Sequence, residues 1–466
     1  MAFMDFQGKK VLVIGAGVSG FAAAKIAKRF GAEVTLSDAK QEADIKEDFA
    51  PLREAGVALA FGPQDESLLS GTDLVIVSPA VPVRIPLIKA AYAKGIHVIS
   101  EVELAYDLAQ SPIVAVTGTN GKTTTTTLVH LLLKTHYAKV GLGGNIGIPL
   151  SEVALEIGVD GAIAAEISSY QMEATEHFHP HVAAELNVTP DHIVRHGSME
   201  VYQEMKERLF AEQTAEDFLV LNYDDEKTRG MKARARSRVC YFSRKEELAE
   251  GAFLKGDRLT ICWAGAEYPL CRVAELGIKG AHNVENALAA AACAFLAGAD
   301  PAKMIPVLRS FRGVEHRIEY VTEIDGVAYY NDSKATNTDS AIKALETFDA
   351  GIVLLAGGDD KMTDLTDFMA LVRARVTELI LIGAAAKRFH EAARVAGIEE
   401  AHIHEVGYSM EKAVETAHAL ARPPQVVLLS PACASFDMYD GMEFRGKHFK
   451  ELVRSYEDKG KGEQAD

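Results

Sequence analysis

The sequence lacks the features of a disulfide-stabilised or zinc-ribbon protein. It has only five cysteines among 466 residues, their number is odd, and no Cys-x-x-Cys pair occurs. Small secreted scaffolds and zinc ribbons depend on regularly spaced cysteines, so neither class is expected. A reducing cytoplasm is the simplest location for such a chain.

The sequence also lacks an excess of positive charge. Its 49 lysines and arginines are outnumbered by 66 aspartates and glutamates, which gives a formal net charge of −17. This balance disfavours a general nucleic-acid binder, although it leaves room for a local basic pocket that takes a phosphorylated small molecule. We therefore expect no nucleic-acid partner.

No long apolar segment occurs either. The most apolar stretch, residues 287–299, is shorter than the roughly 18–20 residues of a membrane span, so it is interpreted as a buried helix. Residues 1–6 show no charged segment followed by an apolar core, so we expect no signal peptide. Membrane insertion is not expected.

What the chain does contain is an ordinary globular composition spread over several domains. Hydrophobic residues make up 48% and charged residues 25% of the 466 residues, and a single domain usually has about 100–200 residues. Short apolar runs alternate with helical stretches through three successive blocks, which predicts an α/β fold with parallel sheets. The strands expected are 9–14, 33–37, 74–77, 97–99, 113–116, 162–167, 182–188, 259–263, 327–330, 351–355, 378–382 and 425–429.

A glycine pattern follows the first expected strand. Gly15-x-Gly17-x-x-Gly20 precedes a helical stretch, and Asp38 stands eighteen residues further on. Such glycines allow a diphosphate to approach a helix N-terminus, and the acid can take a ribose hydroxyl. On this motif alone a nicotinamide or flavin cofactor, another diphosphate ligand and simple tight packing remain open.

The segment Thr117-Gly118-Thr119-Asn120-Gly121-Lys122-Thr123-Thr124 resembles a phosphate-binding loop. Backbone N–H groups of such a loop surround phosphates, the lysine reaches the terminal phosphates, and the next hydroxyl can join Mg²⁺. Val116 stands where the full Walker pattern has its first glycine. The alternative is a glycine-rich turn with a solvated lysine, but two diphosphate-type loops in neighbouring blocks argue against a plain dehydrogenase.

Polar residues follow two further expected strands. Glu166 and His192 each come after an apolar strand, and ligands in open α/β sheets bind beyond the carboxyl ends of strands. Both are therefore placed to reach a metal near the phosphates, although Mg²⁺ rarely takes imidazole. Lys206 lies on an expected helix over 199–211, where most lysines are simply solvated.

The third block contributes three polar segments. Residues 332–337 follow a strand and could equally be a helix N-cap cluster, and residues 357–361 are compatible with a turn or an anion site. Cys433 also follows a strand, but no triad spacing supports a nucleophile, so a packing thiol is the better interpretation.

Taken together, these motifs resemble those of the Mur ligases, in the same order and over nearly the whole chain. The matching segments are GAGVSG, TGTNGKTT, GNIG, EISSYQ, NVTPDH, AHNVENALAA, EHR, NDSKATN and LSPACASFD. The phosphate loop and the His-Asn helix start are shared by all Mur ligases and by folylpolyglutamate synthase. NDSKATN and SPACASFD point to the member of the family that adds D-glutamate.

The resemblance implies three α/β domains. Residues 1–109 would form a Rossmann-like UDP-substrate-binding domain, residues 110–312 a central P-loop ATPase-like domain that binds ATP and magnesium, and residues 313–466 a C-terminal Rossmann-like domain that contacts the amino acid and the nucleotide. We expect a cytoplasmic monomer whose partners are small molecules.

The reaction implied is ATP-dependent amide formation in peptidoglycan precursor synthesis. The carboxylate of UDP-N-acetylmuramoyl-L-alanine would attack the γ-phosphate of ATP, and the amine of D-glutamate would attack the resulting acyl phosphate. The glycine pattern of the first block would then hold uridine diphosphate and not NAD. The UDP-substrate residues implied are Gly15, Gly17, Val18, Ser19, Asp38, Asn145 and Ser168.

The resemblance also assigns ATP and two Mg²⁺ ions to named positions. Thr123 and Glu166 would hold one metal, while His192 and Lys206 would hold the second, the lysine as a carbamate that offers oxygen. Lys122, Glu166, His192 and Lys206 form the catalytic group. The ATP-binding residues implied are Gly118, Thr119, Asn120, Gly121, Lys122, Thr123, Thr124, Asn283, Asn286, Arg317 and Asp332.

D-Glutamate would be held by Lys334, Thr336, Lys361 and Ser435, whereas Met442 stands where some relatives carry an aromatic residue. Three alternatives remain: a sibling ligase that adds L-alanine or a diamino acid, an oxidoreductase built on the first glycine pattern, and a non-catalytic nucleotide-binding regulator. Lys334 and Ser435 in their motifs argue against the sibling, and the retained catalytic group argues against the regulator.

Overall fold

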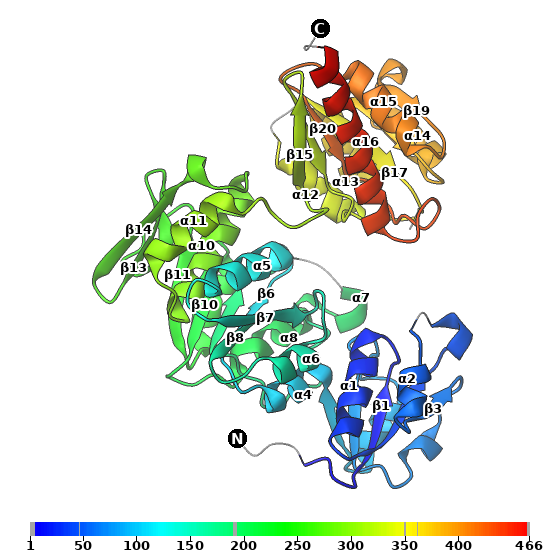
Figure 1. Cartoon of the computed structure of the whole chain (residues 1–466), viewed down its shortest axis with the longest axis vertical. Helices are drawn as coiled ribbons and strands as arrows, with labels where there is room; N and C mark the ends of the chain where they lie inside the picture. Colours follow the sequence, from blue (N-terminus) through cyan, green and yellow to red (C-terminus); the bar gives the residue numbers. More distant parts are fainter. Residues whose placement is uncertain (1–4, 46, 190–192, 349–350, 361, 464–466) are drawn as a thin grey trace. The chain divides into compact units, whose positions relative to one another are not determined.

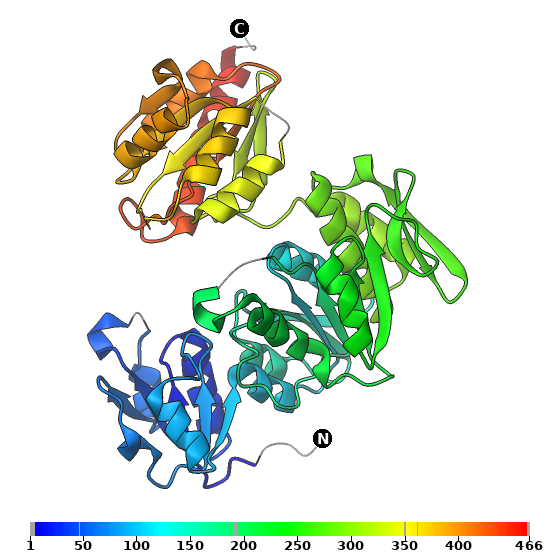
Figure 2. The same cartoon turned by 180° about the vertical axis from the view of Figure 1, so that it is seen from behind.

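The computed structural model describes residues 5–45, 47–189, 193–348, 351–360 and 362–463. The chain forms two compact units, Met1–Leu276 with Asn283–Ser310, and Gly277–His282 with Phe311–Asp466. The first unit contains two β-sheets and the second unit contains one. Figures 1 and 2 show the two faces of each unit.

The first sheet is entirely parallel, in the order β3-β2-β1-β4-β5. Its strands are β1 (Lys10–Ile14), β2 (Glu33–Asp38), β3 (Ala58–Phe61), β4 (Leu74–Val77) and β5 (His97–Ser100). Its helices are α1 (Val18–Arg29), α2 (Ala50–Glu54) and α3 (Pro86–Ala93). The four expected strands are confirmed, and β3, whose residues are mostly half-buried, is additional.

Helix α1 begins at Val18, three residues before the expected Phe21. Gly17 is its extended N-cap, so the glycine pattern overlaps the first turn of the helix. Gly20 lies inside this turn, and a Cβ there would stand 1.7 Å from the carbonyl oxygen of Gly15. The third glycine is therefore required by contact between helix and strand.

The second sheet has nine strands in the order β14-β13-β12-β11-β10-β9-β6-β8-β7. They are β6 (Ile113–Thr117), β7 (Lys139–Gly144), β8 (Gly161–Glu166), β9 (Val182–Glu185), β10 (Phe218–Asn222), β11 (Arg238–Ser243), β12 (Gly251–Lys255), β13 (Arg258–Trp263) and β14 (Ala266–Arg272). All pairs are parallel except β12–β13 and β13–β14, which are antiparallel. Strand β14, which contains Pro269, forms one outer edge.

Helices surround this second sheet. They are α4 (Glu101–Leu108), α5 (Lys122–Leu133), α6 (Leu150–Glu156), α7 (Ile193–His196), α8 (Met199–Ala211), α9 (Glu226–Gly230), α10 (Ala281–Leu296) and α11 (Pro301–Ser310). The expected helix over 199–211 is confirmed to the residue, and the apolar run 287–299 lies mainly in α10, where the alanines from Ala287 onward are buried. No helix of the described residues combines the length and the apolarity that crossing a membrane requires.

One hydrophobic core joins the first two sheets. It includes Val13 of β1, Ala105 of α4, Val153 of α6 and Ala165 of β8. Because α4 packs against both α1 and α6, the first unit behaves as one packed body. The carboxyl ends of β1 and β6, which carry the two glycine loops, are fixed within that body.

The third sheet belongs to the second unit and has the order β15-β16-β20-β17-β18-β19. Its strands are β15 (Glu319–Ile324), β16 (Val327–Asn331), β17 (Ile352–Gly357), β18 (Val376–Ile382), β19 (Ile403–Glu405) and β20 (Val426–Leu429). Only the β15–β16 pair is antiparallel. The four strands expected here are confirmed with small shifts at their ends.

Helices cover both faces of the third sheet. One face packs against α12 (Thr338–Glu346), α13 (Thr366–Arg375) and α14 (Ala386–Val395), and Figure 2 shows this side. The other face packs against α15 (Met410–Leu420) and α16 (Met442–Glu463), and Figure 1 shows that side. This doubly covered parallel sheet is the arrangement that its continuous apolar strands predict.

Candidate functional site

The phosphate-type loop joins the carboxyl end of β6 to α5, and two of its glycines have no substitute. Gly118 and Gly121 have φ values of 154° and 83°, a range that L side chains rarely adopt. A Cβ on Gly121 would also stand 2.3 Å from Oδ1 of Asn286. The loop therefore delivers backbone N–H groups to the first turn of α5, where a phosphate binds favourably.

Asn187 braces this loop from the neighbouring strand. Its Oδ1 accepts a hydrogen bond from the backbone N–H of Asn120 at 2.8 Å, and its carbonyl accepts one from the N–H of Thr119 at 2.9 Å. The expected strand 182–188 ends instead at Glu185, because the chain beyond it turns to the loop. Asn187 lies in the NVTPDH segment, whose sequence alone does not predict this contact with the loop.

The first turn of α5 contains or adjoins several further residues expected to bind ATP. Nζ of Lys122 donates to the carbonyls of Gly118 and Thr119 at 2.8 and 2.9 Å, and Thr123 and Thr124 are buried beside it. Oδ1 of Asn286 accepts from Oγ1 of Thr125 at 3.2 Å. Nδ2 of Asn286 donates to Oδ1 of Asn283 at 3.1 Å, so Asn286 bonds to this turn and Asn283 bonds to Asn286.

Glu166 ends strand β8 one strand away from the loop, and it is buried. Its Oε1 accepts from Nδ2 of Asn145 at 2.7 Å. Its Oε2 is buried and has no hydrogen-bond partner among the described residues. Ser168 follows it and donates from its backbone N–H and its hydroxyl to Oε1 of Gln171.

Lys206 is buried, so its interpretation as a solvated helical lysine is wrong. Its Nζ lies 3.7 Å from Oε1 of Glu185, with the two side chains 1% and 0% exposed. The Nζ also donates to Oγ1 of Thr117 at 3.2 Å. Burial raises the pKa of Glu185 to about 7. His192, expected beside Lys206, lies outside the described residues.

The donor set fits a divalent cation. Both carboxylate oxygens of Glu185, like Oε2 of Glu166, are buried without a hydrogen-bond partner in the part of the chain that the structure describes. A buried carboxylate oxygen without a hydrogen-bond partner is costly, and hard cations such as Mg²⁺ prefer oxygen ligands. Thr123 and Glu166 can therefore hold a metal beside the phosphate loop.

The glycine loop of the first sheet is closed by the segment that follows β4. Gly15 has φ 96°, and a Cβ there would stand 2.7 Å from both Ser78 and Val81. Oδ2 of Asp38 accepts from the N–H of Ala16 at 2.8 Å and Oδ1 from the N–H of Lys40 at 2.9 Å. Asp38 thus shapes the loop as well as standing beside it.

The remaining positions of that loop surround the start of α1. Gly17 has open space around its Cα, Val18 is exposed, and Ser19 is half-buried. This end of the sheet is the carboxyl end of β1 and β2, where open α/β sheets take their ligands. This arrangement is compatible with a diphosphate at the start of α1.

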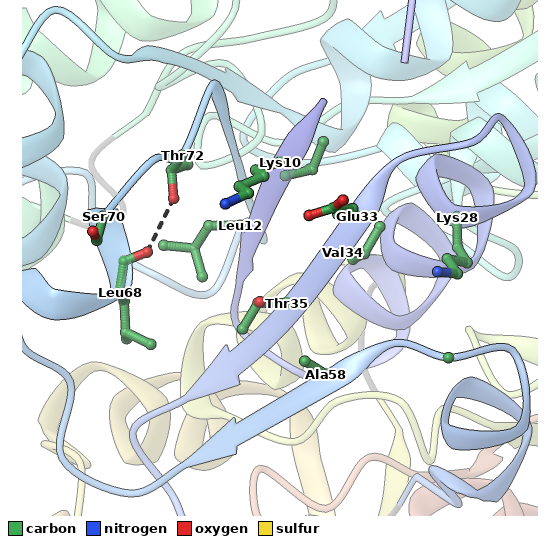
Figure 3. A pocket seen from close by; sticks show the side chains of 12 residues that line it. Lys10, Leu12, Lys28, Glu33, Val34, Thr35, Ala58, Leu68, Ser70 and Thr72 are labelled. Carbon is green, nitrogen blue, oxygen red and sulfur yellow. Dashed lines mark hydrogen bonds between the residues drawn. The ribbon is translucent and has the colours of Figure 1, made fainter. Parts of the chain in front are cut away.

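A cavity of about 380 Å³ occupies the opposite, amino-terminal edge of the same sheet. Figure 3 shows Lys10, Thr35 and Ala58 around it, with the hydroxyl of Thr72 bonded to the carbonyl of Leu68 at 3.0 Å. Because the glycine loop leaves the other end of these strands, this cavity is separate from the diphosphate site.

In the second unit, Arg317 stands between two residues with unusual backbone. His316 and Ile318 have φ values of 65° and 44°, which is rare for residues other than glycine. Oδ1 of Asp332 accepts from the N–H of Ile318 at 3.2 Å, and Oδ2 accepts from the hydroxyl of Ser430 at 2.8 Å. Burial raises the pKa of Asp332 to about 7.

The same turn carries three residues, Glu315, His316 and Glu319, whose ligand atoms lie within 4.8 Å of one another. Nζ of Lys450 donates to Oε1 of Glu315 at 2.6 Å and to Oε1 of Glu319 at 2.9 Å. The lysine supplies the positive charge that a metal would bring, so this cluster is an internal ion-pair network.

The two segments expected to hold D-glutamate meet around a buried arginine, Arg445 of α16. Its guanidinium donates to the hydroxyl and carbonyl of Ser333 at 2.9 and 2.8 Å and to the carbonyls of Cys433 and Ala434. Ser333 adjoins Lys334, and Ala434 adjoins Ser435. Nothing in the local sequence around Arg445 predicts this position, so it is absent from the expected site residues.

Three residues of this region, namely Met442, Asn337 and Cys433, have contacts or burial that bear on their expected roles. The hydroxyl of Ser333 donates to the carbonyl of Met442 at 2.8 Å, so Met442 belongs to the same cluster. Asn337 caps α12 by accepting from the N–H of Ser340, which confirms the N-cap interpretation for that residue. Cys433 is buried and its pKa is raised to about 12 by burial, as a packing thiol requires. Lys361 lies outside the described residues.

Comparison with known protein families assigns a match to each part of the chain. Residues 9–100 match the Mur ligase MurD-like N-terminal domain, residues 116–294 the Mur ligase middle domain, and residues 316–433 the Mur ligase glutamate ligase domain. The three matched segments follow the three sheets.

Relatives that match over nearly their full length are named for the same enzyme activity. The chain is 47% identical over 451 residues to the UDP-N-acetylmuramoylalanine–D-glutamate ligase of Pelotomaculum thermopropionicum, covering 97% of this chain and 98% of the relative. It is 42% identical over 450 residues to the ligase of the same name from a Thermoanaerobacter species, covering 97% and 99%.

Solved structures share the fold at lower identity. A UDP-N-acetylmuramate-alanine ligase, MurC, from Thermotoga maritima has a TM-score of 0.57 at 22% identity, covering 96% of this chain and 99% of that one. MurF from Acinetobacter baumannii also has a TM-score of 0.57, at 16% identity, covering 96% and 93%. At these identities the likeness concerns the fold alone.

Proposed function

Because the chain belongs to the Mur ligase family, we propose that it joins D-glutamate to UDP-N-acetylmuramoyl-L-alanine at the expense of ATP. The product is a precursor of peptidoglycan. The observation that carries this proposal is the phosphate loop at β6–α5 with Glu166 one strand away. The names of the full-length relatives support D-glutamate as the amine donor.

The residues of the phosphate loop position and neutralise the transferring group. Lys122 exchanges its bonds with the Gly118 and Thr119 carbonyls for oxygens of the terminal phosphates, while the N–H groups at the start of α5 hold the phosphates in line. Phosphoryl transfer depends mainly on such positioning and charge neutralisation. The alanine carboxylate then attacks the γ-phosphate and releases ADP.

Thr123 and Glu166 would hold one Mg²⁺, and His192 and Lys206 a second. Bound magnesium supplies Lewis-acid neutralisation of phosphate charge. The support on the protein side is the buried, unpaired Oε2 of Glu166. The side chains of Thr123 and Glu166 already offer oxygen ligands, so the first metal site needs no covalent modification.

The second site requires Lys206 to be carbamylated, because an ammonium cannot coordinate a cation. Addition of CO₂ to the neutral amine forms an N–C bond, releases one proton and yields an anionic oxygen ligand. The burial of the Lys206 side chain, which is 1% exposed, supports this because burial favours the neutral amine, whereas the neighbouring Glu185 carboxylate favours the ammonium until the carbamate forms.

The UDP part of the substrate binds at the glycine loop of the first sheet. Gly15 and Gly17 admit the diphosphate to the N-terminus of α1, where Val18 and Ser19 line the entry. Asp38 holds the loop through the N–H of Ala16 and keeps oxygen lone pairs for a ribose hydroxyl. Asn145 and Ser168 stand near Glu166 and take the muramoyl-alanine end.

D-Glutamate binds to the segments that Arg445 ties together. Lys334 provides a cation for a carboxylate, and the hydroxyls of Thr336 and Ser435 provide hydrogen bonds, with Lys361 as a further cation. We also assign Arg317 and Asp332 of this unit to nucleotide binding. We place the domain boundaries near residues 109 and 312, and the enzyme in the cytoplasm as a monomer.

The experiment that tests this function is ADP release with UDP-N-acetylmuramoyl-L-alanine in parallel reactions containing D-glutamate, L-glutamate, L-alanine or meso-diaminopimelate. D-Glutamate should give the highest kcat/KM, and omission of the UDP substrate should abolish turnover. Equal rates with L-alanine or meso-diaminopimelate would contradict the assignment. An absorbance change at the nicotinamide wavelength with NAD would favour the oxidoreductase instead.

A further inference from the structure

Arg195 makes an unusual number of bonds across the first unit. It lies in α7, and its guanidinium donates to the carbonyls of Pro79, Ala80 and Val81 at 3.1–3.2 Å. It also forms a two-point salt bridge with Glu173, with Nε to Oε1 at 2.9 Å and Nη2 to Oε2 at 2.8 Å. Such a planar fork satisfies several acceptors in a fixed geometry.

One end of this arrangement is the segment that closes the glycine loop of the first sheet. Val81 and the preceding Ser78 are the residues that a Cβ on Gly15 would strike at 2.7 Å. The N–H of Ser78 also bonds to the carbonyl of Ile14 at 2.9 Å. A shift of residues 78–81 therefore changes the shape of the diphosphate site directly.

The other end leads to the phosphate loop of the second sheet. His196, the next residue in α7, packs its ring against Tyr202 with centroids 5.5 Å apart. The hydroxyl of Tyr202 lies 3.0 Å from Oγ1 of Thr119 in the phosphate loop. His196 also bonds through Nε2 to the hydroxyl of Ser169 at 3.0 Å, close to Glu166 in sequence.

A continuous set of contacts thus runs from Gly15 through residues 78–81, Arg195, His196 and Tyr202 to Thr119. The side chain of Arg195 is 12% exposed and that of Glu173 10% exposed, so solvent screens the ion pair weakly. The ring of Tyr170 lies 4.6 Å from the guanidinium carbon and restricts its position further. The Arg195 side chain is therefore fixed by residues 79–81 on one side and by Glu173 and Tyr170 on the other.

We propose that Arg195 is a positioning residue that couples binding of the uridine-diphosphate substrate at the first glycine loop to binding of ATP at the phosphate loop. The substrate identities rest on the function proposed above, whereas the coupling rests on the contacts. A nucleotide that fixes Thr119 fixes α7 through Tyr202 and His196, and Arg195 passes this restriction to residues 78–81. The affinity for each ligand then rises when the other is bound.

The test compares wild type with Arg195→Met and Arg195→Lys as full-length proteins. The dissociation constant of UDP-N-acetylmuramoyl-L-alanine is measured by calorimetry with and without a non-hydrolysable ATP analogue and Mg²⁺. We expect the analogue to tighten binding about 5-fold or more in wild type. The ratio should fall to near one in Arg195→Met and to an intermediate value in Arg195→Lys, because one ammonium cannot serve all five acceptors.

Arg208→Met is the matched control. Arg208 also bonds to the segment around Glu173, through the carbonyls of Met172 and Glu173, but its hydrogen bonds do not reach residues 79–81. This variant should keep the wild-type ratio even if its stability falls. An unchanged ratio in Arg195→Met, or the same loss of ratio in Arg208→Met, would overturn the proposal.

Hydrogen exchange separates this proposal from the proposed function, because it needs no UDP substrate. Adding the ATP analogue with Mg²⁺ should slow amide exchange in residues 78–83 of wild type and leave it unchanged in Arg195→Met. If this protection appears while the UDP substrate fails to bind, the result supports the coupling and contradicts the proposed substrate. If the protection is absent in wild type, or equal in the variant, Arg195 does not couple the loops.

Discussion

Lys206 and Glu185 form an ion pair closed off from solvent, with Nζ 3.7 Å from Oε1 and side chains that are 1% and 0% exposed. Neither oxygen of Glu185 has a hydrogen-bond partner among the residues the structure describes. A buried ion pair is a weak source of stability, because desolvation offsets most of the attraction. Because the pair lies at the carboxyl ends of β6 and β9, we infer a role in the reaction and not in stability.

The first prediction concerns Lys206. Lys206→Ala should lose most activity because the second metal loses an anionic ligand, and small carboxylates such as acetate should partly restore it by filling the vacated space. Lys206→Arg keeps a positive charge but forms no carbamate, so it should remain inactive with or without acetate. ADP release measures all of these, and a fully active Lys206→Arg enzyme would contradict the carbamate.

The second prediction separates the two glycine loops. Lys122→Ala should lower kcat by about 100-fold or more, because a preorganised group on the transferring phosphate is lost, while the affinity for the UDP substrate stays near wild type. Asp38→Ala should instead raise the KM for the UDP substrate more than it lowers kcat, since the N–H of Ala16 loses its acceptor. Identical kinetic profiles for the two variants would show that the ligands are misplaced.

The third prediction concerns pH and Asp332. Burial raises the pKa of Asp332 to about 7, whereas an unfolded aspartate titrates near ~3.9. Between these values the folded protein binds more protons than the unfolded chain, so local stability falls as pH rises from about 4 to about 7. The cost approaches about 1.4 kcal/mol for each unit of pKa shift.

Asp332→Asn removes that cost. Amide exchange in β16 and β20, compared between variant and wild type at each pH, should shift in favour of the variant as pH increases from 4 to 7 and then level off. Parallel profiles over the whole range would mean that Asp332 titrates near its ordinary value in the folded protein.

The fourth prediction concerns Arg445. Arg445→Met leaves the carbonyls of Ser333, Cys433 and Ala434 without their donor, so the two D-glutamate segments should separate. The KM for D-glutamate should rise about 10-fold or more, with the KM for the UDP substrate little changed. Arg454→Met, an exposed change on the same helix, is the control and should leave both values unaltered. An unchanged KM for D-glutamate in Arg445→Met would remove Arg445 from the pocket.

The parts of the site that sequence predicts best are those whose local pattern dictates a conformation. Gly118 and Gly121 adopt the positive φ that their motif requires, and the strand before them and the helix after them follow from apolar periodicity. Many parallel strands of the three sheets are predicted for the same reason, but β7, β10 and β19 are not. The short, half-buried strand β3 is not predicted, because apolar and polar residues alternate only weakly along it.

Contacts between distant segments could not be read from spacing. Arg195 bonds to carbonyls 114–116 positions away and Arg445 to a carbonyl 112 positions away, and no local rule connects an arginine to backbone oxygens at such separations. The burial of Lys206 could not be predicted from the sequence for a related reason, because its partner Glu185 lies on another element. Helical periodicity alone does not distinguish a covered lysine from a solvated one.

Strand β14, at one edge of the nine-stranded sheet, has a consequence for aggregation. An open sheet edge offers unpaired N–H and C=O groups to any other chain, which is a route to aggregation. Here the outermost strand contains Pro269, which has no N–H to donate, and its pairing with β13 shifts register between Arg258 and Thr260. The nine-stranded sheet therefore ends at an edge that a strand from another molecule extends poorly, and Pro269→Thr should make the purified protein more prone to precipitate.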